Sequence, residues 1–178
     1  VSGVAWGSKI MPIRVLGIGG GSSYDVVQGI RYAAGLSNDS NQFPNQPAAI
    51  INLSLGGSGF SQSTQNLFNQ LYNSGIIVIA AAGNESTSTP SYPARYNNVI
   101  SVSATDLNNN LAPYSNFGNF IDIAAPGGDA SKDRNGDGYN DGVLSTLFDE
   151  QTNRESYAFY QGTSMATPHV AGVAALMK

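Results

Sequence analysis

Residues 161–172, Gln-Gly-Thr-Ser-Met-Ala-Thr-Pro-His-Val-Ala-Gly, are the stretch around which the rest of the chain is arranged. The apolar run over residues 170–177 continues it and predicts a buried helix that begins near Ser164. Unpaired backbone N–H groups and the positive end of the helix dipole stabilise negative charge that develops at such a position. Ser164 is therefore placed as a nucleophile would be, although a core helix that is merely capped by Ser and Thr has a similar pattern.

The segments upstream of this helix alternate between apolar strands and amphipathic helices. The pattern predicts strands at residues 11–16, 48–55 and 76–82, and helices around residues 26–34 and 61–74. Continuous apolar runs are typical of central parallel strands, and repeated strand–helix–strand units predict a parallel sheet covered on both faces. We therefore expect one domain with a three-layer α/β/α fold and a mostly parallel sheet. Further strands are expected at residues 98–105, 120–125, 143–148 and 157–161.

Glycines at positions 17 and 19–21 follow the first expected strand and precede a helix. This order superficially resembles a dinucleotide-binding loop, but the sixth position counted from Gly17 is Ser22, where that loop has Gly or Ala. Nucleotide binding is therefore disfavoured. Ligands of parallel α/β sheets bind at the carboxyl ends of the strands, which lie here at residues 16–17, 54–56 and 82–84.

Three separated segments together resemble the subtilisin-like serine proteases, or subtilases. They are Asn-Leu-Ser-Leu-Gly-Gly at 52–57, Ala-Ala-Gly-Asn-Glu at 81–85 and the stretch at 162–172, in the family's order. The resemblance implies a subtilisin-like fold and a serine endopeptidase that cuts peptide bonds through an acyl-enzyme. It also implies that Ser164 attacks, while the Asn84 side-chain amide and the Ser164 N–H donate to the oxyanion.

The same resemblance implies a set of peptide-binding residues. The substrate would add as a strand between residues 20–22 and 54–56, and small residues after two strands would form the specificity pocket. An apolar pocket for a residue further upstream would use Tyr24, Val27 and Leu55, although Val27 and Leu55 could equally be ordinary core. The residues concerned are Gly20, Gly21, Ser22, Tyr24, Val27, Ser54, Leu55, Gly56, Ala81, Ala82 and Gly83, with Glu85 at the rim.

The catalytic partners of Ser164 are the point where the sequence departs from the family. In subtilases the chain order is Asp, His, Ser, so both partners should lie upstream. His169 is the sole histidine, and five residues along a helix rotate it by roughly 140° from Ser164, so we expect it to be structural. Neither Asp-Thr-Gly nor His-Gly-Thr-His occurs. Residues 1–178 are therefore expected to be the C-terminal portion of a catalytic domain, incomplete at its N-terminal side and inactive alone. The expected partners are the upstream part of the domain and a polypeptide substrate.

A second site is expected in Asp-Arg-Asn-Gly-Asp-Gly-Tyr-Asn-Asp at 133–141. Oxygen-bearing side chains alternate there, and Gly138 holds the sixth place, as in the first nine positions of an EF-hand calcium loop. The expected ligands of a structural calcium ion are Asp133, Asn135, Asp137, the Tyr139 carbonyl and Asp141. The twelfth place is Leu144 instead of Glu, so a bidentate ligand is either absent or comes from elsewhere, and Asp129 or Asp149 could supply it. A solvated polar loop is the alternative.

The resemblance implies a fainter cation site at Asp122 with the Asn97 and Val99 carbonyls, and an Asp bonded merely to backbone is the alternative.

Charged residues make up 11% of the chain and its net charge is −4, so the basic stripe of a nucleic-acid-binding surface is absent. No apolar run reaches membrane-spanning length, and the first residues lack a signal-peptide pattern. Secretion is implied by the resemblance. The rival functions are a catalytically dead peptide-binding module and a calcium-stabilised structural domain.

Overall fold

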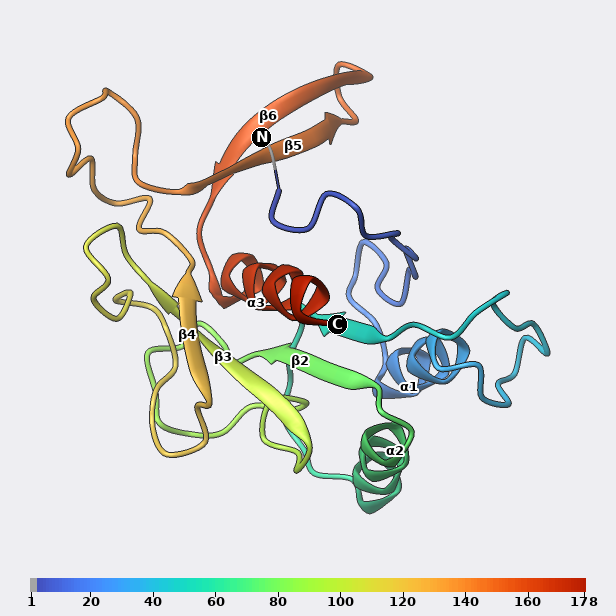
Figure 1. Ribbon diagram of the computed structural model, residues 1–178. Helices are drawn as coiled ribbons and strands as arrows, with labels where there is room; N and C mark the ends of the chain where they lie inside the picture. Colours follow the sequence, from blue (N-terminus) through green and yellow to red (C-terminus); the bar gives the residue numbers. More distant parts are fainter. Residues whose placement is uncertain (1–2) are drawn as a thin grey trace.

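The computed structural model describes residues 3–178, which are organised around a four-stranded sheet in the order β1-β2-β3-β4 (Figure 1). The strands are β1 (Ile50–Leu53), β2 (Ile77–Ala81), β3 (Val99–Thr105) and β4 (Ile123–Pro126). Each neighbouring pair is parallel. The carboxyl ends of all four strands therefore lie at the same edge of the sheet, as expected for the ligand-binding edge of an α/β protein.

Helices cover both faces of this sheet. Helices α1 (Ser23–Ala33) and α2 (Gln62–Asn73) lie on one face, and α3 (Thr163–Met177) crosses the other (Figure 1). The core is divided into two clusters, one on each face of the sheet, because successive side chains of a strand point to opposite faces. Val78 belongs to the cluster that contains Phe68 of α2, whereas Ile79 belongs to the cluster that contains Ala166 of α3. The three-layer α/β/α prediction is confirmed.

The two helices on the first face begin at serine caps. Ser22 forms a capping box with Asp25 at the start of α1, and the Ser61 hydroxyl accepts from the Thr64 N–H at the start of α2. Helix α2 ends before Gly75, whose φ of 75° favours glycine. The helix predicted over residues 61–74 is therefore observed almost residue for residue.

Residues 11–16 differ from the prediction. They form no strand, and the nearest ladder contact is an isolated bridge between Gly17 and Gly20. Met11 and Ile13 instead pack against the core cluster on the α1 side of the sheet. The prediction of a buried strand was wrong, since Met11 and Ile13 are only partly buried and Leu16 is exposed. A strand also needs a hydrogen-bonded neighbour, and none of the described residues supplies one here.

Strands β5 (Val143–Asp149) and β6 (Arg154–Tyr160) form an antiparallel hairpin outside the main sheet. The hairpin projects from the body of the molecule, and its second strand leads directly into α3 (Figure 1). Both segments were predicted as strands, but periodicity could not tell that they pair with each other. Among residues 3–178, no helix is long and apolar enough to cross a membrane.

Candidate active site

Ser164 lies in the first turn of α3, and its surroundings leave its own N–H group free. The helix is preceded by Gly162, which supplies no side-chain cap. The Thr163 N–H donates to Asn84, and the Met165 and Ala166 N–H groups donate to the Gly162 carbonyl. Within residues 3–178, the Ser164 N–H is therefore the unpaired donor of this first turn, at the positive end of the helix dipole.

Asn84 follows β2 and is oriented by Thr163. The Asn84 Oδ1 atom accepts from the Thr163 N–H at 2.8 Å and from the Thr163 hydroxyl at 3.0 Å. Because the oxygen is held twice, the Asn84 Nδ2 atom points away from Thr163. The position that a Cβ atom on Gly162 would occupy is 3.7 Å from Asn84 Nδ2 and 3.6 Å from Ser164 N. Two N–H donors from distant parts of the chain therefore lie at similar distances from one point, which the Met165 sulfur also approaches to 3.6 Å.

The Ser164 side chain contacts the end of β1. The Ser54 hydroxyl donates to the Ser164 carbonyl at 2.9 Å, and the Ser164 hydroxyl lies 3.4 Å from the Ser54 carbonyl oxygen. A carbonyl oxygen cannot remove a proton from a hydroxyl. The His169 Nδ1 atom lies 2.8 Å from the Met165 carbonyl oxygen on its own helix. No described contact therefore connects Ser164 to a base.

A cleft of about 430 Å³ opens beside these groups. Residues after β1, residues after β2 and the start of α3 line it together, including Leu55, Gly56, Ala81, Gly83, Asn84 and Ser164. The wall of the cleft has no room for a side chain at Gly56, because a Cβ atom there would stand 2.8 Å from the Ser91 hydroxyl. The nucleophile candidate and the oxyanion candidate thus face a common cavity at the carboxyl edge of the sheet.

Residues 1–178 match the subtilase family, peptidase S8. The chain belongs to this family. It is 43% identical over 182 residues to an extracellular protease of Xanthomonas campestris pv. campestris, covering 100% of this chain and 29% of that protein. It is 38% identical to thermitase of Thermoactinomyces vulgaris, covering 99% of this chain and 54% of that protein.

A solved structure described as proteases from Pseudoalteromonas arctica PAMC 21717 has the same fold as this subtilase chain. Its TM-score is 0.90 at 44% identity, covering 99% of this chain and 52% of that chain. The subtilase chain therefore spans from about a quarter to about half of the length of these relatives.

The remaining substrate-binding candidates of the subtilase chain lie in three environments. Ala82 is fully buried and contributes its carbonyl, which accepts from the Asn116 side chain. Val27 and Leu55 both pack against the core cluster on the α1 side. Tyr24 is 58% exposed, and its hydroxyl donates to Asp39.

The glycine-rich segment lies at the start of α1. Gly20 has a φ of 93°, and the Ser22 hydroxyl accepts from the Asp25 N–H as the helix cap. A Cβ atom on Gly21 would stand 2.5 Å from the Val15 carbonyl oxygen, so the chain passes itself closely there. None of these residues lines the cleft beside Ser164.

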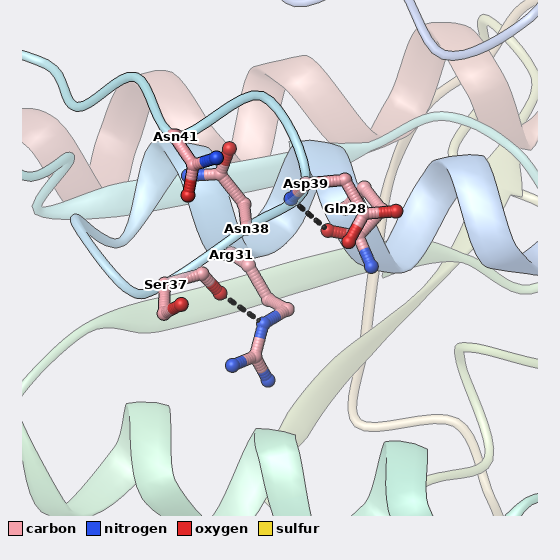
Figure 2. A pocket seen from close by; sticks show the side chains of 6 residues that line it. All are labelled: Gln28, Arg31, Ser37, Asn38, Asp39 and Asn41. Atoms are coloured by element: carbon pink, nitrogen blue, oxygen red, sulfur yellow. Dashed lines mark hydrogen bonds between the residues drawn. The ribbon is translucent and has the colours of Figure 1, made fainter.

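A second hollow, of about 460 Å³, lies beside α1 and is lined by polar side chains (Figure 2). The Arg31 Nε–H donates to the Ser37 carbonyl, and the Asp39 N–H donates to the Gln28 side chain (Figure 2). These two donors are paired, whereas the terminal Arg31 nitrogens form no bond within the described residues. The hollow lies far along the chain from Ser164 and shares no lining residue with the cleft.

The expected calcium loop is exposed and folded through bonds to its own backbone. Asp133 accepts from the Gly136 and Gly138 N–H groups at 2.8 and 3.0 Å. Asn135 accepts from the Asp137 N–H, and Asp137 accepts from the Tyr139 N–H. Among residues 3–178, no three acidic or histidine side chains lie close enough together to hold a metal ion.

The two residues expected to complete the calcium site lie in different places. Asp129 is adjacent to the loop, because its N–H donates to the Asp141 carbonyl at 2.9 Å in an isolated bridge. The Ser131 hydroxyl donates to Asp129 at 2.6 Å and lowers the pKa of that buried carboxyl, and Arg134 lies 3.9 Å from it. Asp149 ends β5, at the opposite end of that strand from the loop, and accepts from the Thr152 hydroxyl. The structure therefore does not bring Asp149 to the loop.

Asp122, the residue expected at the fainter cation site, is bonded to the backbone of β3. The Asp122 carboxylate accepts from the Ser101 N–H at 2.8 Å.

The sequence interpretation missed two residues that contact the candidate oxyanion segment, Thr163 and Asn116. The adjacency of Thr163 to Ser164 is a usable signal, whereas no local pattern distinguishes Asn116 from a turn-forming Asn.

Proposed function

We propose that this chain carries the nucleophile, the oxyanion donors and the substrate pocket of a serine endopeptidase. One observation carries the proposal: the free N–H of Ser164 and the Asn84 Nδ2 atom lie 3.6 and 3.7 Å from the same point beside Gly162, and both residues line one cleft. Donors fixed in advance around developing negative charge are typically the largest electrostatic contribution to acyl transfer.

In the proposed reaction, the Ser164 oxygen attacks the carbonyl carbon of a peptide bond. The carbonyl oxygen becomes an oxyanion that accepts from the Ser164 N–H and from Asn84, and collapse of this intermediate expels the amine and leaves an acyl-enzyme. Water then releases the acid and regenerates the hydroxyl. A base must take the Ser164 proton and return it to the leaving amine.

We propose that the base and the carboxylate that orients it come from an upstream segment of the same catalytic domain. Two facts support this: the sole histidine, His169, contacts its own helix, and the chain spans about half of the length of thermitase. The proposed substrate is a polypeptide and the proposed location is extracellular, as the names of several relatives say of those proteins.

A fluorophosphonate probe tests this proposal. The isolated chain should label very slowly, whereas the chain joined to its upstream segment should label fast, and Ser164→Ala should abolish that labelling. Ser37→Ala, in the second hollow, is the matched control and should change nothing. Strong labelling of the isolated chain would contradict the need for an upstream base. Peptide binding without labelling of the completed domain would favour a catalytically dead module.

We also propose that calcium binds to the loop at 133–141 and stabilises the domain. The alternation of oxygen ligands supports this, as do the N–H bonds of Gly136 and Gly138 to Asp133, which shape the loop around that carboxylate. Binding requires the Asp133, Asp137 and Asp141 carboxylates to draw together. Calorimetry should show a higher melting temperature in calcium than in chelator, and Asp133→Asn should remove the difference. Equal melting in both conditions contradicts the proposal.

A further inference from the structure

Asn116 lies in the connection between β3 and β4, beneath the segment that carries Asn84. It is 1% exposed, so each of its polar atoms needs a partner within the protein. It is neither part of the strand ladder nor close in sequence to the residues it contacts, which lie about 30 positions upstream. Its partners therefore indicate what it holds in place.

All four hydrogen-bonding positions of the Asn116 amide are used on one short segment. The Nδ2 atom donates to the Ala82 carbonyl at 3.0 Å and to the Glu85 carboxylate at 2.7 Å. The Oδ1 atom accepts from the Glu85 N–H at 3.0 Å and from the Thr87 N–H at 3.2 Å. A side-chain amide offers two donor hydrogens and two acceptor lone pairs, so this set is complete.

The bonded residues lie on both sides of Asn84, which is itself exposed. The Asn116 backbone N–H adds a bond to the Gly83 carbonyl at 3.0 Å. A Cβ atom on Gly83 would stand 2.3 Å from Asn116 Nδ2, so the two residues are in close contact. Residues 83–87 belong to no helix or strand, and the Asn116 amide supplies the backbone partners that a ladder would otherwise provide.

We propose that Asn116 is a positioning residue for the oxyanion donor. Thr163 fixes the Asn84 side-chain oxygen, and Asn116 fixes the backbone on either side of Asn84, so the two anchors together set the direction of the Asn84 N–H group. The inference rests on the proposed function, because it assigns Asn116 an effect on the reaction through Asn84. The same amide also orients the Glu85 carboxylate at the cleft.

Asn38 provides a matched control. It is 7% exposed, donates to the Leu36 and Gln42 carbonyls at 3.0 and 2.8 Å, and accepts from the Ser40 N–H. Its chemistry resembles that of Asn116, but it lines the second hollow instead of the cleft. Replacing either residue removes a buried, fully bonded amide, and only one replacement touches the Asn84 segment.

A double-mutant cycle in the completed catalytic domain tests the inference, at temperatures well below every melting point. Asn116→Ala should lower kcat by about 100-fold, approaching the loss of one oxyanion donor, with a smaller change in KM. In the Asn84→Ala background the same substitution should cause almost no further loss, because residues that act as a unit are not additive. Asn38→Ala should lower the melting temperature and leave kcat unchanged.

A second variant covers the case in which Asn116→Ala does not fold. Asn116→Asp keeps the shape of the side chain but turns an acceptor toward the Ala82 carbonyl and the Glu85 carboxylate, so the same loss of kcat is expected. Amide hydrogen exchange at Glu85 and Thr87 should accelerate in both variants. An equal loss of kcat in both backgrounds, or a lower melting temperature with unchanged kcat, would overturn the inference while leaving Ser164 as the nucleophile. Failure of the wild-type domain to label at Ser164 would instead remove the proposed function, and this inference with it.

Discussion

Two hollows of similar volume differ in what their polar groups do. In the hollow of about 460 Å³ beside α1, the Arg31 Nε–H donates to the Ser37 carbonyl and the Asp39 N–H donates to Gln28, so these bonds join residues that are close in the sequence (Figure 2). In the cleft of about 430 Å³, Thr163 holds Asn84 by its oxygen, and the Ser164 N–H stays free within the described residues. Volume therefore does not distinguish a candidate site; two N–H donors that distant parts of the chain orient toward one cleft do.

The hollows also differ in how the chain builds them. The Ser54–Ser164 contacts join residues 110 positions apart, and the Asn84–Thr163 contacts join residues 79 apart. The Gln28–Asp39 bond in the other hollow joins residues 11 apart. The long-range contacts join the sheet to α3, so the geometry of the cleft depends on the whole fold, whereas the hollow beside α1 depends on one helix and its following loop.

The largest effect is expected when one of the two donors is removed from the cleft. Asn84→Ala in the completed domain should lower kcat by about 100-fold to 1,000-fold, the magnitude that the corresponding donor has in subtilisin, a member of this family. KM should change little, since the donor serves the transition state more than the bound substrate. Steady-state kinetics on a peptide substrate measure both constants. A loss of kcat below threefold would contradict the role of Asn84.

Sequence reasoning predicted the parts of the fold that depend on local pattern. The helix over Gln62–Asn73 and the buried strands β1 to β3 follow from periodicity and apolar runs. Residues 11–16 were wrongly predicted as a strand because pairing depends on a neighbour that the segment itself does not specify. The same limit applies to β5 and β6, whose mutual pairing is a property of their turn and register.

The residues of the candidate site also fall into two groups, those that a local motif predicts and those that depend on distant contacts. Ser164, Asn84 and Gly56 were predicted because a motif carries them, and they line the same cleft. Asn116 was missed because its partners lie about 30 residues upstream. Its full set of hydrogen bonds depends on burial in the folded protein, which the local sequence does not specify. The calcium ligands remain a prediction. Alternating oxygen-bearing side chains are typical of a calcium loop, but the same side chains can instead accept hydrogen bonds from the loop's own backbone, as they do here.

The stability of the structure behind the cleft should fall at alkaline pH. Tyr114 donates to the Gly128 carbonyl at 2.8 Å, and burial raises the pKa of its hydroxyl to about 12 from an ordinary value near 10. The folded state therefore favours the protonated form. The corresponding stability is fully present below about pH 10 and is lost as the pH rises through about 12.

Urea unfolding followed between pH 9 and pH 12 measures this loss as a falling midpoint. Tyr114→Phe should lower the midpoint at neutral pH, because the bond to the Gly128 carbonyl is lost, and should make the alkaline fall shallower. Gly128 follows Gly127, whose carbonyl accepts from the Gly162 N–H at 3.0 Å, so the variant also tests the support beneath the start of α3. An alkaline fall of unchanged steepness in Tyr114→Phe would show that other groups cause it.

The smallest effect is expected in the hollow beside α1. Gln28→Ala removes the acceptor of the Asp39 N–H, but water can replace it at this open surface, so the free energy of unfolding should change by less than about 1 kcal/mol. The kcat of the completed domain should be unchanged. Urea unfolding and the peptide assay used for Asn84→Ala measure the two quantities on one preparation. A tenfold fall in kcat would mean that the two hollows are coupled through α1, and the distinction between a locally built hollow and a cleft with two oriented donors would then fail.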